Sequence, residues 1–112
     1  MTAELRDVTG LNSRDVVLAE AVALLKLLAH PVRLSILCNL MRHDEMSAGD
    51  IVKSEESRAS QSQVSQYLAK LRQDDIVSTR REGQTIYYRV KDTEVQALIH
   101  TLYDLLCGEI KD

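Results

Sequence analysis

Residues 60–72, SQSQVSQYLAKLR, form the stretch that decides the fold. At about 100° per residue this stretch has one apolar side, made of Val64, Tyr67, Leu68 and Leu71. The other side is slim, polar and free of acids, and it carries Ser62, Ser65, Gln66, Ala69 and Gln73. Ser60 followed three residues later by Gln63 is a capping-box pattern, which predicts a helix beginning here. An outer face of hydroxyl and amide groups suits the major groove of DNA, and a solvated surface helix is the alternative.

The composition is that of one small, mainly helical domain. The chain has 112 residues, of which 45% are apolar, with four Gly and one Pro. It lacks Phe and Trp, so the core must be aliphatic. No apolar run reaches the roughly 18 residues that span a membrane, and the start, MTAELRDVTG, does not resemble a secretory signal. We therefore expect a cytoplasmic protein that contacts no membrane.

The charges are unevenly distributed along the chain. The net charge of the whole chain is −3, which does not favour DNA binding. Residues 58–91, however, contain seven basic and three acidic side chains, a net charge of +4, and the remainder carries −7. The capped helix thus lies inside the basic segment of an acidic chain, as a nucleic-acid interface requires.

The segments before this helix complete a helix-turn-helix. We expect a flexible arm over residues 1–12. A first helix should follow, with Ser13 or Asn12 as its N-cap, and run to about residue 29. Pro31 suits the first turn of a second helix, which should run to about residue 42. Ser47 predicts the start of a short helix over about 48–54, and residues 55–60 form a turn. A short helix, a turn and a capped second helix match the helix-turn-helix motif.

The segments after it predict a basic hairpin and a long helix. Residues 76–82 and 85–90 are typical of strands, and Gly83 suits the tight turn between them. Arg80 and Arg81 lie beside the hairpin tip, where a wing would reach phosphates or the minor groove, and an ordinary solvated hairpin is the alternative. Asp92 predicts the start of a last helix running to about residue 110. Its long apolar stripe and the first helix are the expected dimer surface.

The predicted DNA contacts come from the capped helix and the wing. They are Ser60, Gln61, Ser62, Gln63, Ser65, Gln66, Lys70, Arg80, Arg81 and Gln84. The predicted partners are therefore double-stranded operator DNA and a second copy of the chain, and the predicted domain spans residues 13–112.

Three segments together resemble the ArsR-type winged-helix repressors. They are residues 27–40 (LLAHPVRLSILCNL), 60–77 (SQSQVSQYLAKLRQDDIV) and 79–90 (TRREGQTIYYRV), about two thirds of the chain in the family's order. The resemblance implies a winged helix of about five helices and a small β-hairpin, dimeric through the first and last helices, that an inducer releases from its operator. Asp75 stands where the family often has Gly, so we expect a strained turn there.

The family's metal motifs are incomplete in this chain. The third helix has no thiol, and on the last helix Asp92 and Glu94 are accompanied by Leu105 and Gly108, which cannot bind a metal. The sequence thus predicts no metal and no cofactor. His30, His43 and His100 show no ligand spacing and are expected at the surface or between helices.

The two cysteines, Cys38 and Cys107, lie 69 residues apart and form no CxxC pair. Their positions resemble those of a two-cysteine branch of the family that responds to persulfides and redox change. The resemblance implies that reactive sulfur species crosslink Cys38 to Cys107 and so release the DNA. Two alternatives stay open: a peroxide sensor that forms a disulfide, and two inert buried thiols.

Two other functional classes fit the sequence less well. A winged-helix module that binds protein rather than DNA is disfavoured by the basic segment, without being excluded. An enzyme is not expected, because the chain has no phosphate-binding loop, no paired carboxylates in a Gly-rich setting and no nucleophile–base motif.

Overall fold

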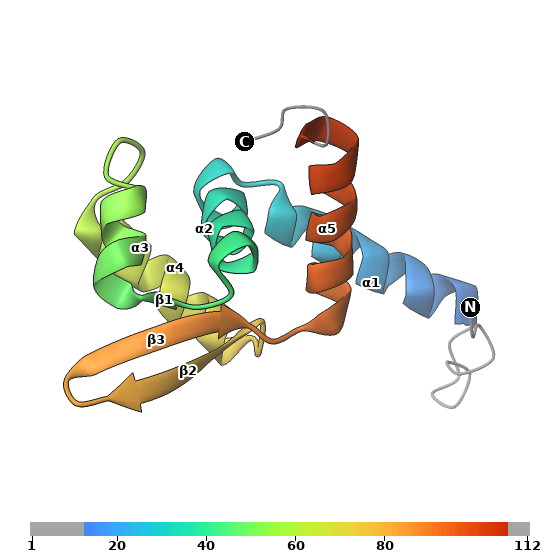
Figure 1. Ribbon diagram of the computed structural model, residues 1–112. Coiled ribbons are helices and arrows are strands. Elements are labelled where there is room, and N and C mark those ends of the chain that lie inside the picture. The colour runs from blue at the N-terminus through green and yellow to red at the C-terminus, as the bar shows by residue number, and fades with distance from the viewer. Residues whose placement is uncertain (1–12, 108–112) are drawn as a thin grey trace.

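The computed structural model describes residues 13–107, which form five helices and three strands (Figure 1). The elements in order are α1 (Ser13–Leu28), α2 (Pro31–His43), β1 (Met46–Ser47), α3 (Ala48–Ser54), α4 (Gln61–Gln73), β2 (Val77–Glu82), β3 (Thr85–Val90) and α5 (Thr93–Cys107). The predicted mainly helical winged helix-turn-helix is confirmed. The predicted arm over residues 1–12 and the predicted last turn of α5 lie outside the described residues.

The helices begin at residues that bind their free backbone N–H groups. Ser47 accepts from the backbone N–H of Asp50 at 3.1 Å, and Asp92 accepts from two N–H groups in the first turn of α5. The capping box of α4 is complete: Ser60 Oγ accepts from Gln63 N–H at 3.1 Å, and Gln63 Oε1 accepts from Ser60 N–H at 2.9 Å. The predicted caps at Ser47, Ser60 and Asp92 are therefore confirmed.

The end of α4 is a Schellman turn built on an aspartate. Asp75 has φ of 62°, in the left-handed region that Gly adopts most easily. Ile76 N–H donates to Leu71 C=O at 2.9 Å, and Asp75 N–H donates to Arg72 C=O at 3.1 Å, which is the Schellman pattern. Ile76 and Leu71 are both buried, as the hydrophobic contact of this turn requires. The expected strained turn at Asp75 is confirmed.

The sheet contains one strand more than the sequence predicts. The strand order is β1-β3-β2, and both neighbouring pairs are antiparallel. Tyr88 of the central strand β3 pairs with Met46 of β1 on one side and with Thr79 of β2 on the other. The predicted hairpin is β2 and β3, turning at Gly83 with φ of 64°. β1 was not predicted, because two residues are too short for an alternating pattern.

The core is aliphatic and lies where α2, α4, α5 and the sheet meet. It includes Ile36 and Leu37 of α2, Val64 and Leu71 of α4, and Ile99 of α5, each at most 2% exposed. This burial orients α4, because its apolar side faces the core and its polar side faces outward. In α1 only Leu28 is buried.

No single described helix is long and apolar enough to cross a membrane; α1 and α2 pass that test only as a pair, bent by 91°.

Candidate nucleic-acid interface

The outer face of α4 is a continuous polar surface. Ser62, Ser65 and Gln66 are exposed, and their side chains make no hydrogen bond to the described residues. Gln61 is also exposed, at the first helical position. These groups can donate to and accept from base edges in a major groove. Ser60 and Gln63, also predicted as DNA contacts, already bond to each other's backbone in the capping box.

The turn between α3 and α4 is held by a buried carboxylate, Glu55. Its side chain is fully buried, and Ser35 Oγ donates to it at 2.6 Å from α2. Asn39 Nδ2 donates to the same oxygen at 3.4 Å, and Arg58 pairs with the other at 3.2 Å. Three donors thus satisfy the buried charge and fix the turn against α2. The sequence pattern did not reveal Glu55, because an acid in a polar turn is usually solvated.

A second contact ties α4 to the start of α2. Tyr67 Oη and His30 Nε2 lie 3.0 Å apart, and the two ring centroids lie 4.9 Å apart. His30 also caps α2, accepting from Arg33 N–H at its Nδ1 at 3.4 Å. Arg33 in turn donates to Leu27 C=O at 2.9 Å. The contact therefore connects the end of α1, the start of α2 and the middle of α4.

Arg80, on β2, belongs to a cluster within the protein. Its guanidinium donates to both carboxylate oxygens of Glu45, at 3.0 and 2.9 Å, and to Glu82 at 3.0 Å. It also stacks over Tyr87, 4.5 Å from the ring centroid. The hydrogen bond from Arg80 lowers the pKa of Glu45 below its usual value of 4.5. Arg80 is exposed, as predicted, but its charge is balanced by two carboxylates.

Arg81 and Gln84 are exposed residues at the tip of the wing, where a ligand can reach them. Both are exposed, and Arg81 Nε donates to Gly83 C=O at 3.1 Å, across the turn. This bond holds Arg81 at the tip without neutralising it. The tip therefore presents one arginine charge and one amide.

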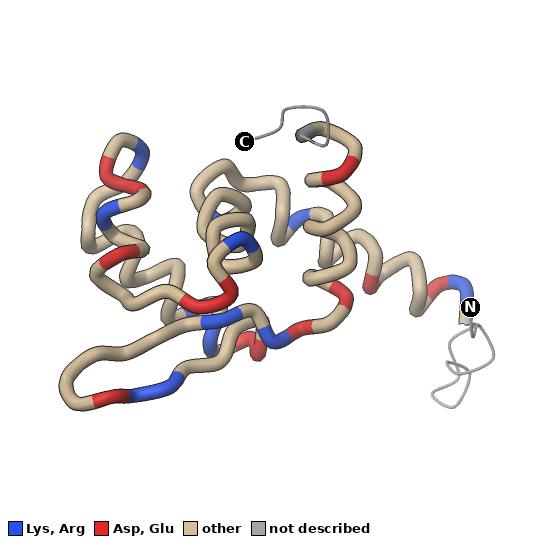
Figure 2. The backbone as a smooth tube through the Cα atoms, viewed as in Figure 1, with Lys and Arg blue, Asp and Glu red and all other residues tan. Residues whose placement is uncertain are grey.

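Most basic side chains of residues 58–91 have an acidic partner within 4 Å. In Figure 2 red segments accordingly lie beside most of the blue ones in the helix-turn-helix and wing. The paired ones are Arg58, Lys70, Arg80, Arg89 and Lys91. Within the described part of the chain, Arg72 and Arg81 have no such partner. These two residues therefore contribute most of the uncompensated positive charge here.

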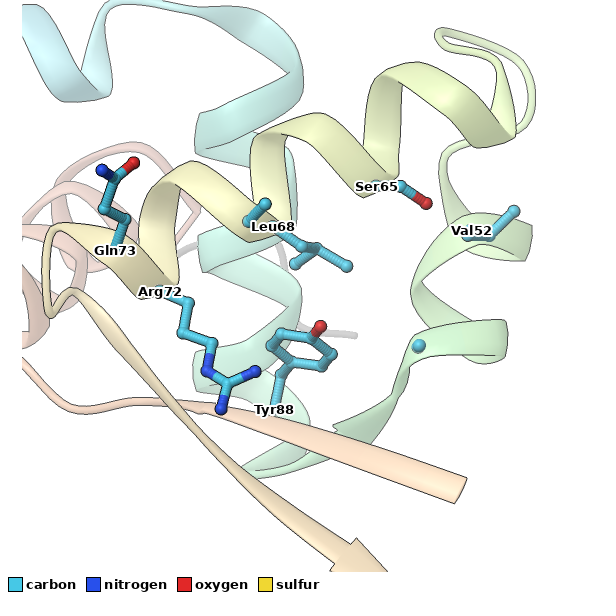
Figure 3. A pocket seen from close by; sticks show the side chains of 8 residues that line it. Val52, Ser65, Leu68, Arg72, Gln73 and Tyr88 are labelled. Atoms are coloured by element: carbon cyan, nitrogen blue, oxygen red, sulfur yellow. The ribbon is translucent and has the colours of Figure 1, made fainter. Parts of the chain in front are cut away.

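A groove of about 500 Å³ runs beside α4, between α3 and β3 (Figure 3). Ser65, Arg72 and Gln73 line it from α4, and Tyr88 rises into it from β3. Figure 3 shows the Arg72 side chain extending from the helix toward the strand. The sequence prediction did not include Arg72 among the contacts, because the groove forms only when β3 packs beside α4.

Cys38 lies on α2, half-buried, facing α5. A cavity of about 190 Å³ separates the two helices; it is lined by Cys38, Met41, Arg42, Ile99, His100 and Tyr103. His100 Nδ1 lies 3.6 Å from an oxygen of Asp104, one turn further along α5. Cys107 is the last residue of α5, and its side chain lies outside the described part of the chain. The predicted pairing of the two cysteines is therefore untested.

The fold and this surface match known regulators. The model of the bacterial regulatory protein, arsR family, matches residues 30–79, the segment from the α2 cap to the start of the wing. The transcriptional activator HlyU of Vibrio cholerae is 47% identical over 89 residues, covering 80% of each chain. The chain belongs to the ArsR family.

Solved structures of similar proteins share the fold over most of this chain. Reduced HlyU from Vibrio cholerae has a TM-score of 0.77 at 44% identity, covering 87% of this chain and 99% of that one. The transcriptional repressor BigR from Xylella fastidiosa has a TM-score of 0.70 at 36% identity, covering 84% and 93%. This ArsR-family chain is accordingly a transcriptional regulator and not an enzyme, as the sequence predicted.

Proposed function

We propose that the protein is a homodimeric repressor that binds operator DNA through α4 and the wing and is released by a dithiol switch. The observation that carries the DNA-binding part is the capped helix α4, whose polar, acid-free outer face is exposed beside a wing with an open arginine. The amide of Gln66 suits adenine, and Ser62 and Ser65 serve several bases. Arg81 and Gln84 contact the backbone or minor groove. Lys70, an exposed residue of α4 whose charge is partly balanced by Asp74, also belongs to the proposed contact surface.

The dimer forms through α1 and α5. Leu18, Val22 and Leu25 form a stripe along α1 and are 60%, 42% and 60% exposed. Leu105 and Leu106 of α5 are more than 70% exposed. Surfaces of this kind mark interfaces between proteins. Two copies of residues 13–112 would place two helices α4 in successive major grooves of a palindrome, in the cytoplasm, where operator DNA is.

The dithiol switch rests on where Cys38 lies. Cys38 lines the cavity between α2 and α5, and His100 and Tyr103 line it from α5. Cys107 is the last residue of α5, the helix that also carries His100 and Tyr103. One solved relative is named as reduced HlyU, by its redox state. A Cys38–Cys107 bridge would tie α2 to α5 and change how the dimer spaces its two α4 helices.

The proposed inducer is a persulfide, RSSH. A cysteine thiolate attacks its outer sulfur, a Cys–S–SH bond forms and RS⁻ leaves. The second thiolate then attacks the inner sulfur of the protein persulfide and releases HS⁻, which gives a disulfide. If a second RSSH first lengthens the persulfide by one sulfur, the same displacement gives a trisulfide bridge. A peroxide that oxidises the dithiol would instead give a disulfide and water.

Salt-dependent binding tests the DNA part. A gel shift on DNA selected by the protein should weaken steeply as salt rises, because several phosphates are contacted. Absence of binding at low salt would refute the repressor and favour a module that binds protein.

Intact mass tests the switch. After persulfide treatment, we expect the loss of two hydrogens, with one sulfur gained where the bridge is a trisulfide, and Cys38→Ser and Cys107→Ser should bind DNA but ignore persulfide. A bridge that gains no sulfur and forms only with peroxide would identify a peroxide sensor. Release of either Ser variant by persulfide would refute the crosslink.

A further inference from the structure

The groove beside α4 contains an arginine without an acidic partner. Arg72 is exposed, and the residues that line the groove with it include no acid. The two acids that follow α4 have other partners: Asp74 pairs with Lys70 at 3.5 Å, and Asp75 pairs with Lys91 at 3.3 Å. The guanidinium charge of Arg72 is therefore available to an anion from outside the chain.

The position of the groove identifies the anion. One wall is α4, through Ser65 and Gln73 of the outer face that we propose enters the major groove. The other wall is β3, which carries the wing (Figure 3). When a helix occupies a major groove and a wing the adjacent minor groove, the DNA backbone that separates the two grooves passes between helix and wing. Ser65 and Tyr88, which line this groove together with Arg72, each carry a hydroxyl group (Figure 3).

We propose that Arg72 binds a backbone phosphate of the DNA in this groove. The proposal rests on the proposed DNA-binding function and adds a contact that fixes α4 and the wing on one strand. A guanidinium suits this role, because it can hold two phosphate oxygens at once. Arg80, although nearer the wing tip in sequence, is already neutralised by Glu45 and Glu82.

The test compares Arg72→Gln with Arg72→Lys and with Arg14→Gln. Arg14 is exposed in the first turn of α1, a helix that does not line the groove, and serves as the matched loss of one charge. The probe is a fluorescent mixed-sequence duplex about three helical turns long, because phosphate contacts do not depend on sequence. The dissociation constant is measured by anisotropy from low to high NaCl.

We expect Arg72→Gln to weaken binding roughly tenfold at low salt and to reduce the salt slope by about 0.9 per protomer. Arg72→Lys should keep the slope, and Arg14→Gln should behave as the unmodified protein. An unchanged slope in Arg72→Gln, with a reduced slope in Arg81→Gln, would overturn the phosphate site and leave the interface standing. No binding by the unmodified protein would overturn both.

A measurement on the unmodified protein avoids any folding defect of the variants. Phenylglyoxal modifies exposed arginines, and mass spectrometry of peptides quantifies each site. DNA should reduce the modification of Arg72 at least several-fold and leave that of Arg14 unchanged. Equal modification of Arg72 with and without bound DNA would overturn the proposal.

Discussion

Asp75 holds a conformation that costs an L-residue about 1 kcal/mol or more, at the end of the helix that we propose reads DNA. Asp75→Gly should therefore raise the free energy of unfolding by about 0.5 kcal/mol, after the greater unfolded-state entropy of Gly is subtracted. The exposed ion pair with Lys91 contributes little to this balance. Urea unfolding measures the change. Asp75→Ala is the control: it also removes the ion pair but keeps a Cβ, so it should not stabilise.

Glu55 is the described residue whose loss should cost most at the interface. Its buried carboxylate receives hydrogen bonds from Ser35, Asn39 and Arg58. Glu55→Ala should lower the free energy of unfolding by about 3 kcal/mol, because it leaves the part-buried donors of Ser35 and Asn39 without this acceptor and removes a buried carboxylate paired with Arg58. Glu55→Gln, which keeps the shape and one acceptor, should cost less. Equal stability of Glu55→Ala and the unmodified protein in urea would contradict the assigned network.

The two faces of α4 predict separate effects on stability and on base preference, because one face packs in the core and we propose that the other meets DNA bases. Gln66 is exposed and makes no hydrogen bond to the described residues, so Gln66→Ala should leave unfolding unchanged and relax base preference by about 1–3 kcal/mol at one position. Arg81→Ala is the contrast, since it should weaken binding equally on all sequences. Selection of bound sequences from a random pool measures both. Unchanged specificity in Gln66→Ala would mean that another face of α4 meets the bases.

The wing should depend on pH through Glu45. Arg80 lowers the pKa of Glu45 in the folded protein, so the stabilisation is complete above the usual value of 4.5 and is lost as the pH falls through the lowered pKa. Carboxyl NMR titration should find a pKa below 4.5 in the unmodified protein and a return toward 4.5 in Arg80→Gln. A pKa of Glu45 that is the same in both proteins would contradict the contact.

The features that could be predicted from the sequence are those produced by residues close together in the chain. The caps at Ser47, Ser60 and Asp92, the Gly83 turn and the apolar side of α4 each depend on residues a few positions apart. β1, the Glu55 network and the groove at Arg72 depend on segments brought together only by folding. Arg80 shows the difference: its sequence neighbours are Thr79, Arg81 and Glu82, but its bidentate partner is Glu45, 35 residues away.

In the folded molecule an apolar surface of α1 stays exposed, and this surface predicts that the protein forms a dimer. Leu18 and Leu25 are each 60% exposed. Leu18→Glu with Leu25→Glu should convert a dimer to a folded monomer and reduce operator affinity by several orders of magnitude, because each protomer would then bind alone. Sedimentation measures the mass. Lys53→Glu, an exposed change on α3, should stay dimeric. A mass of one chain for the unmodified protein would contradict the dimer.

The pairing of β1 has a consequence for the spacing of half-sites that the proposed dimer would accept. Ser47 ends the strand that pairs with β3 and also caps α3, so the wing and the helix-turn-helix share a residue. β3 also lines the groove beside α4, so we expect α4 and the wing to move together as one unit. What can then vary is the position of this unit in one protomer relative to the same unit in the partner protomer of the proposed dimer. One extra base pair between half-sites would rotate them by about 34° and defeat binding as thoroughly as a changed half-site.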